Sequence, residues 1–175
     1  MQLEEILTSN NIIEEINNNL DELLKLIPEL KYMMFFEHKH PHHHLDVWEH
    51  TLYALSLSEN DFEIRLCLLL HDIGKPFSYQ EGKIRHYKGH ALESAIMTND
   101  ILHRLGYNNE FNEKICYLIE KHDTPISKQD IIDNYDLSVK RYKIQVCDAL
   151  AHNPAKLKNR IKYLNKTKKL IKANH

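Results

Sequence analysis

The sequence predicts an all-α fold, a helical bundle with one short β-hairpin. Four glycines and five prolines are few for 175 residues, which favours long helices joined by short connections. Apolar residues recur at helical spacing along most of the chain, and several segments begin with a capping residue followed three positions later by an acid. This length fits one hydrophobic core, so we expect residues 1–175 to form a single domain.

The first third of the chain is expected to supply packing helices and one polar loop. Two acidic amphipathic helices are predicted at residues 2–9 and 12–27. A histidine-rich loop over residues 37–44 then leads to a helix that begins after Asp46, and Asn60 is expected to cap the next helix. The loop histidines are expected to be solvated at the mouth of a site; they are His38, His40, His42, His43 and His44.

The helix that ends near residue 72 is predicted to be the buried centre of the fold. Its residues 66–70 are apolar without interruption, and His71 and Asp72 then follow. Burying these two side chains costs free energy unless partners satisfy them. A carboxylate at a helix C-terminus also meets the negative end of the helix dipole, so a divalent cation is the obvious partner. We expect Gly74 to end this helix in the left-handed conformation.

The rest of the chain is predicted to be helical after one β-hairpin. The hairpin pairs residues 77–80 with residues 83–87 around Glu81-Gly82. Further helices are expected at residues 89–105 and 110–121, from Ser127, from Ser138, and from Asn153-Pro154 to the end of the chain.

The last helix, over residues 154–174, is strongly basic. No acid follows Asp148, whereas eight lysines and arginines do. Lysines on the outer face of a docked helix are common, and that is one interpretation. The other is that the charge guides a nucleotide or an RNA end toward a cleft, an effect that salt would weaken.

Composition limits the class of protein. Hydrophobic residues make up 42% of the chain, yet no apolar run approaches the ~20 residues that span a bilayer, so no membrane association is expected. The first residues carry acids where a signal peptide would carry bases. Three widely separated cysteines exclude a disulfide framework and a Cys-x-x-Cys zinc site. We therefore expect a cytoplasmic protein.

Six metal-capable side chains fall on inward helix faces or at helix ends, although they come from five different helices. They are His50, His71, Asp72, His90, His122 and Asp148. No local regularity explains this pattern, and a shared ion would. Imidazoles and carboxylates without thiolate favour iron, manganese, cobalt, nickel or magnesium over structural zinc. The set suffices for one divalent metal ion, or for two if one carboxylate bridges them.

The order of these residues resembles a known family. His50, then His71-Asp72 in a His-Asp-x-Gly-Lys context, then Asp148, is similar to the HD superfamily of metal-dependent phosphohydrolases. The match covers about residues 40–152. Three motifs, His44-Leu-Asp-Val-Trp-Glu-His50-Thr, His71-Asp-Ile-Gly-Lys-Pro76 and His86-Tyr-Lys-Gly-His90, resemble the HD domain appended to bacterial CCA-adding and poly(A) polymerase-type tRNA nucleotidyltransferases. The nucleotidyltransferase signature itself, Gly-Ser followed by paired aspartates, does not occur in the sequence.

The resemblance implies a role for each matched residue. The metal ligands would be His50, His71, Asp72 and Asp148, with His90 and His122 added where a second metal is bound and Asp72 bridging. Lys75 occupies the position that faces the substrate phosphate. A metal-bound hydroxide, positioned by Asp72 and Asp148, would attack a phosphate ester, and His86 or His44 would protonate the leaving oxygen.

The expected substrate is a phosphomonoester or phosphodiester of nucleotide type. It would be a phosphorylated small molecule, a nucleotide or an RNA end, and a 2′,3′-cyclic phosphate is one candidate. Two alternatives stay open. The first is a di-iron oxygenase, which some two-metal members of the superfamily are. The second is a non-catalytic nucleic-acid-binding or regulatory module that keeps the fold without the chemistry.

Overall fold

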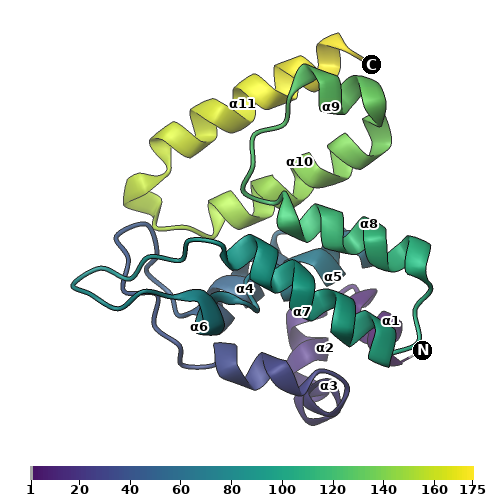
Figure 1. Ribbon diagram of the computed structural model, residues 1–175, viewed down its shortest axis with the longest axis vertical. Coiled ribbons are helices and arrows are strands. Elements are labelled where there is room, and N and C mark those ends of the chain that lie inside the picture. The colour runs from purple at the N-terminus through teal and green to yellow at the C-terminus, as the bar shows by residue number, and fades with distance from the viewer. Residues whose placement is uncertain (1) are drawn as a thin grey trace.

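The computed structural model describes residues 2–175 and is built of helices (Figure 1). In chain order they are α1 (Gln2–Leu7), α2 (Ile12–Asn18), α3 (Leu20–Leu26), the 3-10 helix η1 (Pro28–Met33), α4 (Val47–Ser56), α5 (Phe62–Leu70), α6 (Lys75–Ser78), α7 (His90–Arg104), α8 (Asn109–Glu120), α9 (Lys128–Asp133), α10 (Tyr135–Leu150), the 3-10 helix η2 (Pro154–Lys156) and α11 (Lys158–Ala173). Residues 2–175 contain two isolated β-bridges and no longer strand. The all-α prediction is therefore confirmed.

Helix α5 lies at the centre of the fold, as its apolar run predicts. Its residues from Ile64 to Leu70 are buried, and it contacts α1, α4, α8 and α10. The predicted cap is wrong by one residue, because the Asp61 side chain, and not that of Asn60, accepts the hydrogen bond from the Ile64 N–H at 3.0 Å. Asn60 instead donates to the backbone oxygen of Thr8 at 2.7 Å and so ties the start of α5 to the end of α1.

Other helix boundaries also differ from the sequence prediction. The helix expected from Asn153-Pro154 begins as the 3-10 helix η2, and the α-helix α11 starts only at Lys158. The expected helix over residues 12–27 is two helices, because the backbone at Asn19 leaves the helical region between α2 and α3. The helix expected from Ser138 begins at Tyr135, where the side chain of Asn134 accepts a hydrogen bond from the Leu137 N–H at 3.1 Å. By contrast, Asp46 and Glu49 form the predicted capping box at the start of α4.

The predicted left-handed conformation of Gly74 is wrong, and a close approach between helices explains the glycine instead. Gly74 has φ −81°, and the chain continues directly into α6. A Cβ at this position would lie 2.6 Å from the backbone nitrogen of Ser94 on α7. The Gly74 N–H also donates to Ser94 Oγ at 2.9 Å. The absence of a side chain therefore lets α7 approach the turn that carries His71 and Asp72.

The predicted β-hairpin does not form two strands. Phe77 belongs to α6, and one antiparallel bridge, Gln80 to His86, closes the turn with N–O distances of 2.8 and 3.3 Å. The Arg85 guanidinium lies 4.7 Å from the ring centroid of Phe36 and 4.8 Å from that of Tyr79. Hydrogen bonds attach the segment to the histidine-rich loop in place of a strand ladder: the Arg85 N–H donates to the Lys39 carbonyl at 2.9 Å, and the Arg85 guanidinium donates to the Glu37 carbonyl at 2.7 Å.

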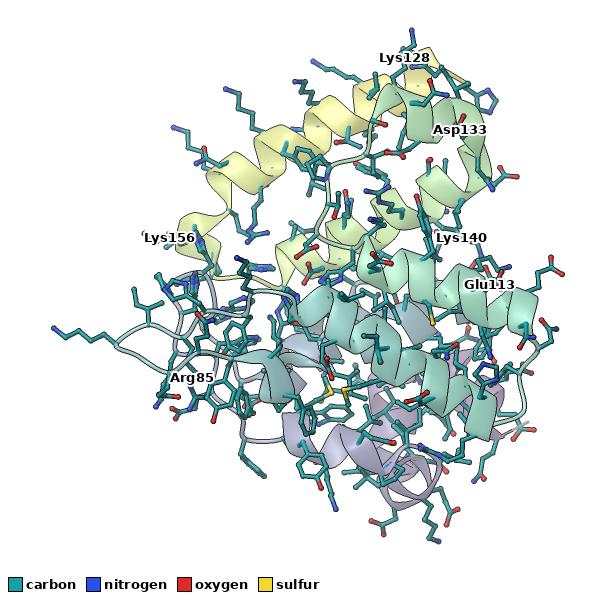
Figure 2. All side chains as sticks on the ribbon, viewed as in Figure 1. Arg85, Glu113, Lys128, Asp133, Lys140 and Lys156 are labelled. Carbon is teal, nitrogen blue, oxygen red and sulfur yellow. The ribbon has the colours of Figure 1, made fainter. Side chains whose placement is uncertain are left out.

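Helix α11 packs on α9 and α10 at one side of the molecule (Figure 1). Leu164 and Ile171 are buried there, whereas Ile161 is exposed. Figure 2 shows long side chains ending in nitrogen along the outer side of α11. None of the helices in residues 2–175 combines the length and apolar character needed to cross a bilayer.

Substitution of Gly74 tests the close approach to α7. Gly74→Ala should lower the free energy of unfolding by about 1–3 kcal/mol, because a methyl group would be forced against backbone atoms of Ser94. Gly82→Ala is the matched control, since Gly82 is exposed and an added Cβ would meet only Ile84, at 3.3 Å or more. Urea unfolding followed by circular dichroism measures both. Equal losses in the two variants would contradict the steric explanation.

Candidate metal centre

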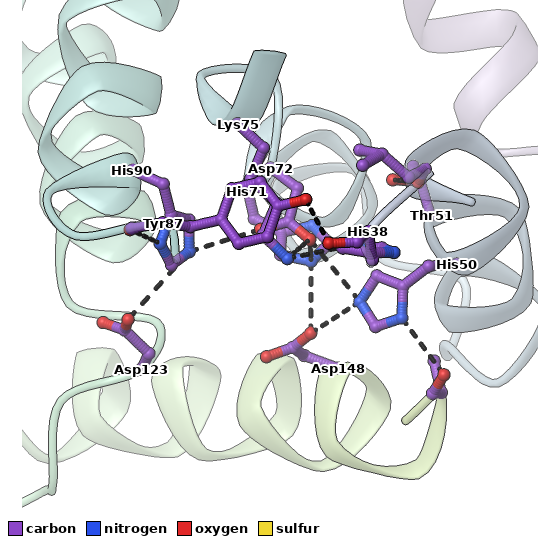
Figure 3. Close-up of polar contacts among 12 residues, drawn as sticks. His38, His50, Thr51, His71, Asp72, Lys75, Tyr87, His90, Asp123 and Asp148 are labelled. Atoms are coloured by element: carbon purple, nitrogen blue, oxygen red, sulfur yellow. Dashed lines mark hydrogen bonds and ion pairs between the residues drawn. The ribbon is translucent and has the colours of Figure 1, made fainter. Parts of the chain in front are cut away.

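Four predicted ligands converge from three parts of the chain (Figure 3). His50 comes from α4, His71 and Asp72 from the end of α5, and Asp148 from α10, and all four are buried. One donor atom from each lies within 4.8 Å of the others. Asp148 Oδ1 lies 2.8 Å from His50 Nε2 and 3.2 Å from His71 Nε2. The structure thus brings together side chains that are up to 98 residues apart in the sequence.

A second group shares Asp72 with the first. Asp72 Oδ1 lies 3.4 Å from His90 Nε2 and 3.9 Å from His122 Nε2, and these two nitrogens are 3.4 Å apart. Asp72 Oδ2 faces the first group instead, at 3.3 Å from His71 Nε2 and 3.6 Å from His50 Nε2. Asp72 therefore offers one carboxylate oxygen to each group.

Each of the four imidazoles is oriented by a backbone carbonyl. The Nδ1 atoms of His50, His71, His90 and His122 lie 3.1, 2.6, 2.9 and 2.6 Å from the carbonyl oxygens of Ala151, Leu68, Tyr87 and Ile119. A carbonyl can only accept, so Nδ1–H is the donor in every case and Nε2 faces the carboxylates. Histidines that ligate metals commonly have this arrangement, because the second nitrogen is held by an outer partner.

The Asp72 carboxylate supplies a direct test of whether these residues fit a cation. Both of its oxygens are buried, and neither accepts a hydrogen bond of good geometry, although the Lys75 ammonium approaches Oδ2 to 2.9 Å. Buried carboxylate oxygens are rarely left in this condition. The cluster is consistent with a divalent metal site, and imidazole nitrogen with carboxylate oxygen suits such an ion.

The charged side chains of the cluster shift one another's pKa values. Burial opposes protonation of His71, but the carboxylates of Asp72 and Asp148 outweigh it and raise the pKa of His71 to about 10. Burial would raise the pKa of Asp72, yet His71 and Lys75 hold that pKa well below its usual range. Burial lowers the pKa of His122 and keeps this ring neutral. A metal ion in the first group would thus take the place of the proton on His71.

Lys75 is buried beside the cluster and is held by a partner that the sequence did not suggest. Its Nζ lies 3.0 Å from His38 Nε2, and burial together with the Lys75 charge lowers the pKa of His38 to about 2. His38 Nε2 therefore accepts from the ammonium, while Nδ1–H donates to the Leu45 carbonyl at 2.8 Å. The Tyr87 ring centroid lies 5.3 Å from Nζ. His38 is 2% exposed, so the prediction that it is solvated is wrong.

The cluster opens into a cavity of about 530 Å³, here called the main cavity. Asp72, Lys75 and Asp148 line it together with His86, which is exposed. His44 does not line the main cavity but is exposed over a separate hollow beside residues 35–49.

Two further residues of the main cavity were missed by sequence reasoning. His152 is buried, and Arg160 comes from α11. His152 follows Asp148 by four residues and donates from Nδ1 to its carbonyl at 2.7 Å, so helical spacing was an available signal for this residue. No comparable signal pointed to Arg160.

An all-α fold with a buried centre of imidazoles and carboxylates is consistent with the class of proteins that hold divalent metal ions. Within that class the HD domain family matches residues 42–164, and the chain therefore belongs to the HD domain family. This result confirms the resemblance drawn from the motifs. It assigns the chain to a superfamily of metal-dependent phosphohydrolases.

Among the curated relatives that the chain matches, two are named tRNA nucleotidyltransferases and one is named a multifunctional CCA protein. The chain is 34% identical over 105 residues to a CC-adding tRNA nucleotidyltransferase of Thermus thermophilus. The matched region covers 55% of this chain and 24% of the relative. It is 32% identical over 97 residues to an A-adding tRNA nucleotidyltransferase of Deinococcus radiodurans, covering 50% and 22%. It is 30% identical over 84 residues to a multifunctional CCA protein of Shewanella denitrificans, covering 46% and 20%. The matched region thus spans less than a quarter of the length of each relative.

The raised pKa of His71 predicts how the stability of metal-free protein depends on pH. Because the folded pKa of about 10 exceeds the usual value of 6.5, protonated His71 stabilises the folded state. That contribution is complete below about pH 6.5 and is lost as pH rises toward 10. In excess chelator, urea unfolding of the wild type should lose more stability between pH 6.5 and 9.5 than that of His71→Asn. Parallel pH profiles would contradict the assignment.

Proposed function

We propose that this protein is a cytoplasmic metal-dependent phosphohydrolase that acts on a phosphate ester of nucleotide type. The proposed metal ligands are His50, His71, Asp72, His90, His122 and Asp148. The observation that carries the proposal is the buried Asp72 carboxylate, with one oxygen directed to each group of imidazole Nε2 atoms and Lys75 at its side. We propose two ions, with Asp72 between them.

The chemistry divides between the ion and the side chains. A bound divalent ion would lower the pKa of a coordinated water and polarise a phosphoryl oxygen. Lys75 would offset negative charge that builds up on the phosphoryl oxygens. Its ammonium is fixed for that role by Asp72 and by His38, at 2.9 and 3.0 Å. Asp72 and Asp148 would orient the attacking water with their carboxylate oxygens.

The leaving oxygen needs a proton, and His86 is the proposed donor. It lines the main cavity, and its backbone is fixed by the bridge to Gln80. Imidazole titrates near neutral pH, which suits general acid catalysis. The proposed participation of His44 stays a sequence prediction, and its exposed position over a separate hollow gives it no added support.

The cavity and the relatives together support a phosphate ester substrate. Lys75, Lys88, Lys121 and Arg160 line the main cavity and would attract anions. The relatives are named for work on tRNA, which supports a nucleotide or an RNA end as substrate. A terminal 2′,3′-cyclic phosphate is one candidate, and the lysines of α11 would then contact the RNA backbone.

Hydrolysis of a panel of phosphate esters tests the proposal. The panel contains p-nitrophenyl phosphate, its diester, nucleoside monophosphates and nucleoside 2′,3′-cyclic phosphates, each assayed with Mn²⁺, Ni²⁺, Co²⁺ and Mg²⁺. Asp72→Ala should lower kcat/KM by about 100-fold or more, because it removes the carboxylate shared by both groups of ligands. Asp136→Ala, an exposed acid on the same helix as Asp148, should retain activity.

The outcomes of that panel are distinct. If the metal-loaded wild type hydrolyses none of the esters, the proposal fails. Iron above one per chain with oxygen consumption and no phosphate release would instead favour the di-iron oxygenase. Thermal unfolding of each variant separates loss of chemistry from loss of fold.

Substitution of Lys75 tests its role toward the phosphate. Lys75→Gln should reduce kcat by about 100-fold, because charge on the phosphoryl oxygens would lose a fixed cation. Lys128→Gln, an exposed lysine on α9, is the control for charge alone. Steady-state kinetics on whichever ester is turned over fastest measures both. A Lys75→Gln enzyme with unchanged kcat would show that Lys75 has only a structural role.

A further inference from the structure

A second cavity of about 310 Å³ adjoins the main cavity, and the function proposed above does not use it. It lies against α10 and α11 and is here called the α10/α11 cavity. His122, Asp123, Asp148 and Arg160 line both cavities, so the two meet at these residues. A ligand with its phosphate beside Asp72 would therefore have space to extend past Asp148 into the α10/α11 cavity.

The walls of the α10/α11 cavity differ from those of the main cavity. Apolar groups come from Pro125, Ala149, Leu164 and the Tyr163 ring. Beyond the four residues shared with the main cavity, the polar groups are the side-chain amides of Gln145 and Asn159. Small-molecule sites typically combine apolar walls with a few fixed polar groups, in cavities of roughly 300–1,000 Å³. A flat heterocycle with a hydrogen-bonding edge fits this chemistry better than a sugar or a phosphate would.

The Tyr163 hydroxyl and the Gln145 amide are held in place before any ligand arrives. The Tyr163 hydroxyl accepts a hydrogen bond from the Ile126 N–H at 3.1 Å and lies 3.5 Å from Gln145 Oε1. Gln145 is buried, and its Nε2 donates to the Thr124 carbonyl at 2.7 Å. Groups fixed in this way lose little conformational entropy when a ligand binds, so the cavity is preorganised.

Arg160 stands where the two cavities meet and has no acidic partner. Within residues 2–175 no carboxylate lies within 4.0 Å of its guanidinium, although the side chain is half-buried. A guanidinium presents a planar set of donors that matches phosphate oxygens. Its position suits contact with the phosphate, or with the sugar hydroxyls, of a ligand that spans both cavities.

We propose that the α10/α11 cavity binds the nucleobase of a nucleotide whose phosphate lies at Asp72 and Lys75. The base stacks on the Tyr163 ring, Gln145 and Asn159 contact its polar edge, and Arg160 contacts the part of the nucleotide between the two ends. This inference deepens the proposed function and rests on it for the position of the phosphate. It assigns the substrate to nucleotides and not to phosphorylated sugars or free phosphate.

Binding to metal-free protein tests the base site separately from hydrolysis. Isothermal titration in chelator compares AMP, UMP, ribose 5-phosphate and inorganic phosphate as probes. AMP should bind about 10-fold more tightly than ribose 5-phosphate, because stacking of a base on an aromatic ring contributes roughly that much. Equal affinities for AMP and for ribose 5-phosphate would overturn the proposed base site but would leave the hydrolase proposal untouched.

Substitutions of Tyr163 and Arg160 test whether the base binds in the α10/α11 cavity. Tyr163→Ala should abolish the preference for AMP over ribose 5-phosphate, whereas Tyr163→Phe, which keeps the ring, should retain it. Arg160→Ala should weaken binding of AMP and of ribose 5-phosphate together. Tyr53→Ala removes an exposed tyrosine of α4 that lines neither cavity and is the matched control. A preference that survives Tyr163→Ala would overturn the proposal.

A measurement on the wild type covers the possibility that Tyr163→Ala does not fold. Nuclear Overhauser effects between the base protons of AMP and the ring protons of Tyr163 are expected in the metal-free complex. Contacts from the base to the rings of the histidine-rich loop, in place of Tyr163, would place the base elsewhere and refute the assignment.

Discussion

The Asp72 carboxylate is the constraint on which the rest of the structure depends. It is 1% exposed, it is charged, and four imidazole nitrogens surround it at 3.3–3.9 Å. A buried carboxylate in such a position requires either several protons on its neighbours or a cation among them. The groups that hold those neighbours are mainly backbone carbonyls. His71, His90 and His122 each bond the carbonyl three residues earlier in the chain. Leu68 and Ile119 lie in the last turns of α5 and α8, where carbonyls lack helical partners, and Tyr87 immediately precedes the start of α7.

Much of this arrangement could be predicted from the sequence, because the signals are local. Helical spacing put His50 and His122 on apolar faces, and the apolar run before His71 identified the buried helix. The prediction failed where distant segments decide the local conformation. Gly74 was interpreted as a helix stop, yet Ser94, 20 residues later, is what requires a glycine there. The segment around Arg85 was interpreted as strands, yet its stacking on Phe36 and Tyr79 gives it a conformation that strand propensity does not encode.

Two of the residues that sequence reasoning missed, His38 and Arg160, are distinguished by contacts with remote parts of the chain, whereas His152 bonds the carbonyl of Asp148, four residues earlier. His38 contacts Lys75 across 37 residues and lies in a histidine-rich loop that is polar by composition. Arg160 belongs to a helix with many other basic residues, so nothing in the pattern distinguishes it from the solvated lysines around it. Only the three-dimensional arrangement separates the arginine that lines two cavities from the rest. The basic residues of α11 therefore differ in their surroundings. Arg160 lines both cavities, whereas the lysines around it are solvated.

The central claim is that divalent ions bind around Asp72. Crystals of protein purified without an affinity tag and loaded with Mn²⁺ or Co²⁺ would test it most directly, through anomalous scattering recorded above and below the absorption edge of the metal. We expect one peak within coordination distance of His50, His71, Asp72 and Asp148, and a second between Asp72, His90 and His122. Peaks confined to the histidine-rich loop or to other surface histidines, with none beside Asp72, would contradict it.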